Sequence, residues 1–119
     1  MSASDESDAY SGADRYCDLI LNGKEPVDRV HETEHVLAFH HTRPSYPVHI
    51  VVVPKRHVAS LTALEDADNA LVIELFGVIR EVAATVERET GACRIVTNLG
   101  AYQDSKHLHF HVVSGSARP

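Results

Sequence analysis

The chain has 119 residues, of which 44% are hydrophobic, and it carries a formal net charge of −6. This length is enough to bury one modest core and leaves no room for a second domain of ordinary size. An acidic chain lacks the positively charged face on which nonspecific binding to DNA or RNA depends. A nucleic-acid polymer is therefore excluded as a partner, whereas a single small nucleotide is not.

The N-terminal segment and the cysteines bear on the cellular compartment of the protein. Residues 1–13 contain too little apolar surface to offset the entropy of ordering, so we expect a disordered acidic tail before a single domain at 14–119. No apolar stretch approaches the ~20 residues of a membrane-spanning helix, and the N-terminus lacks the pattern of a secretion signal. We therefore expect a cytoplasmic protein without membrane contact, with Cys17 and Cys93 reduced.

The first half of the chain alternates short elements with turns. In chain order the pattern predicts a helix at 14–21 and strands at 27–31, 36–40 and 49–53. Asn22-Gly23 is typical of a left-handed helix cap. The prolines of the segment 43–47 impose a loop, and Pro54 ends the clearest strand because it has no amide hydrogen to continue a ladder.

The second half contains one long helix, predicted at 66–88 from apolar residues at helical spacing. Thr62 and Glu65 before it resemble a capping box, and Gly91 ends it. Two further strands are predicted at 94–98 and 107–113. The result is an α+β domain with about five mainly antiparallel strands. The apolar stripe of the helix is wider than one sheet face needs, which favours a homodimer.

Three histidines alternate with apolar residues in the last predicted strand. Successive side chains of a strand point to opposite faces, so His107, His109 and His111 are expected on one face, with Leu108 and Phe110 against the core. Histidine titrates near neutral pH and serves as nucleophile, acid or hydrogen-bond donor. The row therefore predicts a chemical site.

A metal site is the rival interpretation of this row. At ~3.3 Å per residue the Cα atoms of His107 and His111 lie ~13 Å apart, whereas two nitrogens bound to one zinc ion lie within ~4 Å. All three histidines would not reach one ion, and a zinc site would need a ligand from elsewhere. His49, in the other strong strand, is the obvious candidate for that ligand.

Residues 107–113 read His-apolar-His-apolar-His followed by two apolar residues, which resembles the signature of the histidine triad (HIT) family of nucleotide hydrolases and transferases. Other segments resemble the family in the same order, namely 36–40, 49–57, Asn98-Leu99-Gly100 and Gln103. The resemblance covers about residues 17–113, and it implies a HIT-like fold with one long helix and one short N-terminal helix.

The resemblance also implies residue roles. His109 would attack the α-phosphorus of a nucleotide, and water would hydrolyse the nucleotidyl-histidine, which divides one difficult displacement into two. The other ring nitrogen of His109 would donate to a backbone carbonyl. His107 and His111 would orient the strand and donate to the phosphate, and His49 would support the phosphate or the imidazole. The residues expected to bind the substrate are Asn98, Gln103, Ser105, His41 and Phe39.

Some of these positions have plainer explanations or depart from the family. Ser105 is also explained as a turn residue and Phe39 as a core residue. His41 stands where many members have an acidic residue that accepts hydrogen bonds from the ribose hydroxyls, and a neutral histidine accepts only one. The loop between Asn98 and His107 is shorter than in many members.

Two further positions bear on whether a zinc ion is bound and on which branch of the HIT family the chain resembles. Some bacterial members hold a structural zinc ion with a Cys-x-x-Cys pair and two histidines, but here Ile20 stands three residues after Cys17. We therefore expect no zinc and no other cofactor. The transferase branch typically ends the triad with glutamine, so His111 favours a hydrolase.

The sequence thus predicts a homodimeric phosphoramidase or related hydrolase that cleaves at the α-phosphate of a purine nucleotide conjugate. The conjugate would be an adenosine phosphoramidate, an acyl nucleotide or a dinucleoside polyphosphate, and Lys106 is compatible with the last. Two alternatives remain open. One is a dimeric nucleotide-binding signalling module with little catalysis, and the other is a metal-binding protein that uses His49 and triad histidines.

Overall fold

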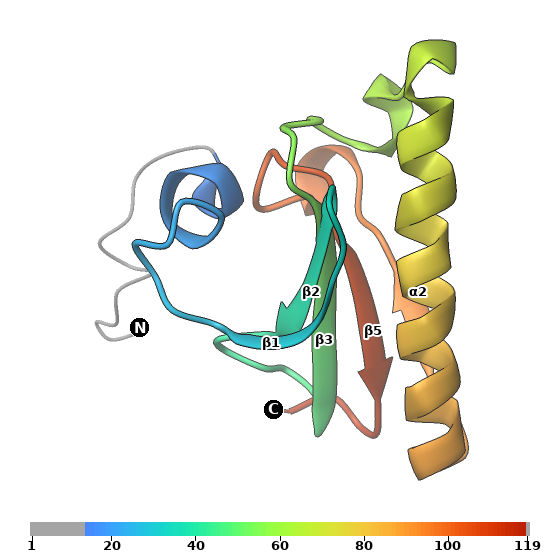
Figure 1. Cartoon of the computed structure of the whole chain (residues 1–119). Coiled ribbons are helices and arrows are strands. Elements are labelled where there is room, and N and C mark those ends of the chain that lie inside the picture. The colour runs from blue at the N-terminus through green and yellow to red at the C-terminus, as the bar shows by residue number, and fades with distance from the viewer. Residues whose placement is uncertain (1–13, 119) are drawn as a thin grey trace.

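The computed structural model describes residues 14–118, so the predicted disorder of residues 1–13 falls outside the described residues. Five strands form one antiparallel sheet in the order β1-β2-β3-β5-β4. Helix α2 lies along one face, and the N-terminal helical segment η1 lies beside the other (Figure 1). The predicted α+β class is confirmed. The strands are β1 (Asp28–Glu32), β2 (Val36–His40), β3 (Val48–Pro54), β4 (Arg94–Val96) and β5 (Phe110–Ser114).

Helix α2 spans Asn69–Thr90 and ends at Gly91, whose positive φ of 90° is a conformation that glycine adopts without a Cβ clash. The capping box predicted from Thr62 and Glu65 is wrong. The box is formed by Glu65 and Asp68, whose side chain accepts the backbone N–H of Glu65 at 2.9 Å. Asp68 reaches this position because 66–68 form a 3₁₀ turn, η3 (Asp66–Asp68), ahead of the helix. No helix within residues 14–118 is long and apolar enough to cross a membrane.

The short helical segments are tighter or wider than ordinary α-helix. The helix predicted at 14–21 is the π-helical segment η1 (Tyr16–Ile20), in which the N–H of Leu21 donates to the carbonyl of Tyr16 at 2.6 Å. A residue spacing of five is the π-helical hydrogen bond, and such turns are frequent at functional sites. The other two short segments are the 3₁₀ turns η2 (Leu61–Ala63) and η4 (Gly100–Tyr102).

The strand predicted at 107–113 is corrected, because regular pairing in β5 begins only at Phe110. Two residues earlier, the N–H of Leu108 donates to the carbonyl of Val58, which belongs to a loop and not to a neighbouring strand. The carbonyl of His109 likewise accepts a hydrogen bond from the side chain of Thr97 at 2.8 Å. In the residues just before β5, hydrogen bonds to a loop carbonyl and to a side chain therefore replace the regular hydrogen bonds between strands.

Three other predicted strands shift by smaller amounts, and the one predicted at 49–53 is extended by one residue at each end in β3. The other two are β4 and β1. The strand predicted at 94–98 ends at Val96, because the next residue, Thr97, uses its hydroxyl to bind the segment before β5. The strand predicted at 27–31 runs from 28 to 32, and a register irregularity between Arg29 and His31 interrupts its pairing with β2. Both are edge strands, where pairing on one side only specifies the ends weakly.

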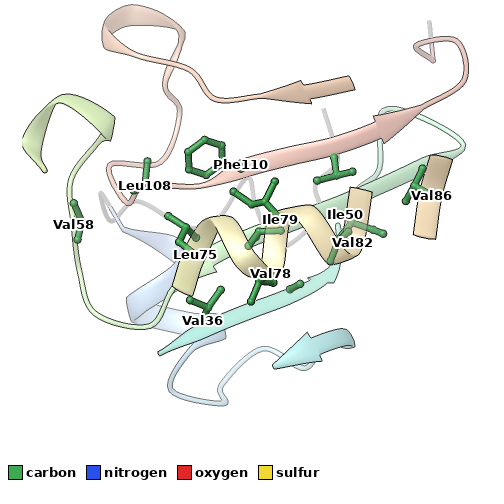
Figure 2. Packing of buried hydrophobic residues seen from close by; sticks show 13 residues of the cluster. Val36, Ile50, Val58, Leu75, Val78, Ile79, Val82, Val86, Leu108 and Phe110 are labelled. Carbon is green, nitrogen blue, oxygen red and sulfur yellow. The ribbon is translucent and has the colours of Figure 1, made fainter. Parts of the chain in front are cut away.

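The main core lies between α2 and the sheet. Figure 2 shows Leu75, Val78, Ile79 and Val82 of α2 packed against side chains of the strands. On the sheet side, Ile50 and Phe110 belong to the same cluster. Leu108 also belongs to it, so its side chain points to the core although it precedes the regular strand. The side chains of the triad segment therefore alternate between the two faces as predicted, although the residues before Phe110 lack the hydrogen bonds of a regular strand.

A second, smaller cluster covers the opposite face of the sheet. Tyr16 and Ile20 of η1 pack there against Leu37 and Phe39 of β2 and Val51 and Val53 of β3. Because strand side chains alternate, β2 and β3 are buried on both faces. The π-helical segment thus sits beside the sheet face that carries the histidines.

Candidate active site

His109 is held in one tautomer by the backbone. Its Nδ1 lies 2.7 Å from the carbonyl oxygen of His107, and only a protonated ring nitrogen can donate there. A neutral imidazole with its proton on Nδ1 carries a lone pair on Nε2. Burial lowers the pKa of His109, although the hydrogen bond to the carbonyl opposes this. His109 is only 6% exposed, so its ring is shielded from solvent. Its Nε2 is therefore an unprotonated nucleophile in a buried position.

His49 and His111 form a hydrogen-bonded chain that starts at the backbone. Burial, followed by the neighbouring histidines, lowers the pKa of each ring to about 4, so both are neutral near pH 7. The N–H of Ser45 donates to Nδ1 of His49 at 3.0 Å, so His49 carries its proton on Nε2. Nε2 of His49 then donates to Nδ1 of His111 at 2.8 Å. His111 is left with its own proton on Nε2.

The ring of His111 lies beside the ring of His109. The ring centroids of His109 and His111 are 4.9 Å apart, in an edge-to-face arrangement. One ring therefore offers a lone pair and its neighbour offers an N–H. Adjacent groups of opposite hydrogen-bonding character are what a displacement at phosphorus needs, since one attacks while the other stabilises developing charge.

His107 is completely buried and has a different environment from the other two. Its Nε2 donates to the carbonyl of Pro54 at 2.7 Å, and its Nδ1 lies 3.0 Å from the carboxylate of Asp14 and 3.3 Å from the sulfur of Cys17. Both ring nitrogens have protein partners, so the predicted donation from His107 to a phosphate is corrected. His107 instead orients His109, whose Nδ1 proton its carbonyl accepts.

Four potential metal ligands gather around this buried ring. One ligand atom each from Asp14, Cys17, His57 and His107 lies within 4.8 Å of all the others. The expectation of no zinc rests on the missing second cysteine, and the structure puts the carboxylate of Asp14 in its place. Oxygen, sulfur and two nitrogens are a donor set that zinc accepts in proteins. These four residues would hold a divalent cation, which would cross-link η1 to the triad segment.

The thiol of this cluster is protonated when no cation is bound. Burial and the nearby carboxylate of Asp14 raise the pKa of Cys17 to about 11. The same carboxylate contacts Nδ1 of His57 and of His107, so it ties the two histidines together by itself. Sequence reasoning missed Asp14 and His57. The spacing Asp14-x-x-Cys17 was the available signal.

Asn98 lines the same hollow as the histidine chain, and its role in substrate binding stays a prediction. The cavity has a volume of about 300 Å³ and is lined by Ser45, Tyr46, His49, Val96, Asn98, His111 and Val113. Ser45 was missed because the proline-rich segment indicated only a loop. A larger cavity of about 410 Å³ lies between α2 and β1, β2 and β3, and none of the predicted site residues lines it.

A second and smaller hollow adjoins the triad on the side of η1. It is lined by Arg15, Tyr16, Ile20, Phe39, His41 and Thr42. Phe39 is 1% exposed and belongs to the small core cluster, so its core interpretation is correct even though it borders the hollow. The ring centroid of Tyr16 lies 5.0 Å from that of His109 and 6.1 Å from that of Phe39. Tyr16, another residue that the sequence did not single out, therefore covers the nucleophile.

His41 lies between the two hollows. Its ring centroid is 4.4 Å from that of His49 and 6.2 Å from that of His111. The backbone N–H of Arg43 donates to its Nδ1 at 2.9 Å. Burial, followed by the neighbouring histidines and arginines, lowers the pKa of His41 to about 4.

The loop before the triad is held together internally. The side-chain amide of Gln103 donates to the carbonyl of Ala59 at 2.7 Å and is almost fully buried. Lys106 donates to the carbonyls of Gly100 and Gln103. The hydroxyl of Ser105 is buried without a hydrogen-bond partner within residues 14–118. Gln103 therefore anchors the loop, whereas Ser105 retains a free hydroxyl.

Comparison with known proteins agrees with this fold. The HIT domain profile matches residues 22–118. The chain is 39% identical over 99 residues to a HIT-like protein of Azospirillum brasilense, covering 81% of each. It is similar to the structure of a histidine triad protein from Clostridium difficile, with a TM-score of 0.74 and 35% identity over 89% of this chain and 93% of that one. A HIT family hydrolase from Legionella pneumophila gives a TM-score of 0.76 at 28% identity, over 87% and 93%. The chain belongs to the HIT family.

Proposed function

We propose that this protein hydrolyses a purine nucleotide conjugate at its α-phosphorus, with His109 as the nucleophile. The observation that carries the proposal is the hydrogen bond from Nδ1 of His109 to the carbonyl of His107, which leaves Nε2 unprotonated. A HIT family hydrolase is among the similar structures, and this supports the same class of reaction.

The reaction has two displacements. Nε2 of His109 attacks the α-phosphorus, and the bond from phosphorus to the leaving nitrogen or oxygen breaks with its electron pair on the leaving group. The N–H of His111 donates to the phosphate or to the departing atom, and His49 holds that N–H in place. Water then attacks the phosphorus of the nucleotidyl-histidine, which releases the nucleoside monophosphate and restores the imidazole.

A phosphoramidate is the preferred substrate class. Lys106, the residue compatible with a longer polyphosphate, uses its ammonium group on two loop carbonyls. The experiment compares turnover of adenosine phosphoramidate, an acyl adenylate and a diadenosine polyphosphate, and searches for an adenylyl adduct on His109 by mass spectrometry after rapid quenching. We expect fastest turnover of the phosphoramidate and an adduct on His109. Tight nucleotide binding without turnover of any of the three would instead favour a signalling module.

Activity is expected to persist at mildly acidic pH. Burial holds the pKa of His49 and His111 at about 4, below the ordinary value of 6.5, so their hydrogen-bonded chain stays neutral at pH 5. Between these values the unfolded chain binds protons that the folded pair does not bind, so the free energy of unfolding falls as pH falls through this window. The measurement is kcat/KM against pH, with thermal melts at each pH. A loss of kcat/KM centred near pH 6.5 would contradict the prediction.

We also propose that the protein is a homodimer formed through α2 and the β4 edge. Ile73 and Phe76 of α2 are 75% and 44% exposed, and Ile95 of β4 is 48% exposed. The ring of Phe76 packs on Phe110 of β5, the strand that pairs with β4. Within residues 14–118, β4 pairs on one side only, and an exposed apolar edge strand is a template for a second chain.

Replacing Ile95 with lysine should weaken this dimer, because charge on an edge strand opposes pairing. We expect the dimer dissociation constant to rise by at least about tenfold, as for a central apolar interface residue. Sedimentation velocity over a range of protein concentrations measures it. Thr85→Lys is the matched control, since Thr85 is exposed on α2 and borders the cavity on the β1 side. A wild-type chain that is monomeric at every concentration would rule out the dimer.

A further inference from the structure

The backbone N–H that sets the proton of His49 belongs to an exposed loop. Residues 42–45 are all exposed, and the N–H of Ser45 donates to Nδ1 of His49 at 3.0 Å. A segment with few buried contacts opens easily, so this amide needs a further contact to keep one orientation. The segment after β5 supplies it, because the N–H of Arg118 donates to the carbonyl of Ser45 at 2.7 Å.

Gly115 turns the chain back onto this loop. β3 begins where β5 ends, since Val48, the first residue of β3, pairs with Ser114, the last residue of β5. Gly115 follows with a φ of 91°, a conformation that residues with a Cβ rarely adopt. A Cβ at this position would lie 2.7 Å from Cγ of Pro47, which is too close for two carbon atoms. Both the turn and the proline ring therefore require glycine.

Ser45 stands at the start of a continuous hydrogen-bonded chain. Its N–H donates to Nδ1 of His49, and Nε2 of His49 donates to Nδ1 of His111 at 2.8 Å. An amide N–H cannot accept a proton, so it permits only the neutral His49 with its proton on Nε2. His111 is then left with its own proton on Nε2.

The chain would reverse if the amide of Ser45 moved away. With its proton on Nδ1, His49 would accept a hydrogen bond at Nε2 from Nδ1 of His111. His111 would then present a lone pair in place of its N–H, and a lone pair does not stabilise negative charge that develops on a phosphate. The orientation of Ser45 therefore decides whether His111 is a donor.

We propose that the segment 115–118 positions the proton of His111, through Ser45 and His49, for the reaction at the α-phosphorus. Arg118 acts through its backbone N–H and Gly115 through its turn, so both are positioning residues. The effect on turnover rests on the proposed function, whereas the tautomer of His49 is a property of the protein alone.

Arg118→Pro tests this positioning, because proline has no backbone N–H. Arg118→Ala is the matched control, since it keeps the N–H and shortens only an exposed side chain. Nitrogen NMR of isotope-labelled histidine distinguishes the two tautomers, and the signals of His49 are assigned from their loss in His49→Gln. We expect the proton of His49 on Nε2 in the wild type and in Arg118→Ala, whereas Arg118→Pro also populates the form with the proton on Nδ1.

Turnover of adenosine phosphoramidate should fall with the tautomer. We expect kcat to drop at least about tenfold in Arg118→Pro and to stay unchanged in Arg118→Ala. Complete loss of a donor to developing charge costs about a hundredfold or more, and a mixture of tautomers costs part of that.

Gly115→Ala is a second variant that leaves Arg118 intact. Its methyl group would displace the segment from Pro47, so the tautomer of His49 and kcat should change in the same direction. Gly23→Ala is the control for backbone strain. Gly23 has a similar φ of 82°, but a Cβ there would have no neighbour within 4 Å, so the tautomer and kcat should not change.

The outcomes separate this positioning from the reaction itself. A wild-type His49 with its proton on Nδ1, or a tautomer unchanged in both Arg118→Pro and Gly115→Ala, overturns the inference and leaves the proposed function standing. A changed tautomer with unchanged turnover also overturns it, because the proton of His111 would then not matter to the reaction. A changed tautomer in a protein whose wild type hydrolyses none of the three conjugates overturns the proposed function and leaves the positioning of the proton standing.

Discussion

His109→Ala is expected to lower kcat on adenosine phosphoramidate by at least about a thousandfold, as for removal of a nucleophile in other covalent enzymes. The reason is that the hydrogen bond of Nδ1 to the backbone leaves Nε2 of His109 unprotonated, and the ring of His111 lies next to that of His109. Steady-state turnover measures the loss. Intact-mass spectrometry of the quenched reaction should find no adenylyl adduct on the variant.

Two controls separate chemistry from folding. His109 is buried and its ring lies close to that of Tyr16, so alanine also leaves a cavity. His109→Gln fills more of this space and should be equally inactive while keeping nucleotide affinity. His31→Ala removes a histidine from β1, far along the sheet from β5, and should keep full turnover. Wild-type turnover in either His109 variant would refute the role of His109.

Leu75→Ala is expected to lower the free energy of unfolding by about 2–5 kcal/mol, the range for removing a buried leucine from a core. Leu75 is 0% exposed and lies in the cluster that joins α2 to the sheet (Figure 2). A cavity at this position removes contacts on both sides at once, because the interior is close-packed. Urea unfolding followed by circular dichroism gives the change.

The control for this variant is Arg80→Ala in the same helix. Arg80 is exposed, so its truncation should change the free energy of unfolding by less than about 0.5 kcal/mol. Alanine has the higher helix propensity, so helix formation itself is not weakened in either variant. An equal effect of the two substitutions would mean that Leu75 does not carry the packing assigned to it.

Much of the fold was predictable because its signals are local. The segment 36–40 is a strand with the predicted bounds, and Gly91 ends the long helix where expected. The spacing of apolar residues and the position of a helix-ending glycine are signals that span only a few residues. They therefore predict helices and strands without knowledge of the tertiary packing. The start of β5 was wrong because it depends on partners in distant segments, namely Val58 and Thr97. The capping box was wrong because a local 3₁₀ turn at 66–68 delays the start of the helix.

The sequence by itself determined the family and the alternation that separates His107, His109 and His111 from the core. Only the tertiary structure decided what each histidine does with its protons. His107 is satisfied by Pro54 and Asp14, His49 is set by the amide of Ser45, and His41 is set by the amide of Arg43. A ring's tautomer follows from the partner on its other nitrogen. For His107 the partners lie far away along the chain, so no local spacing reveals them, whereas the amides that set His49 and His41 lie four and two residues away and depend on the local shape of a loop.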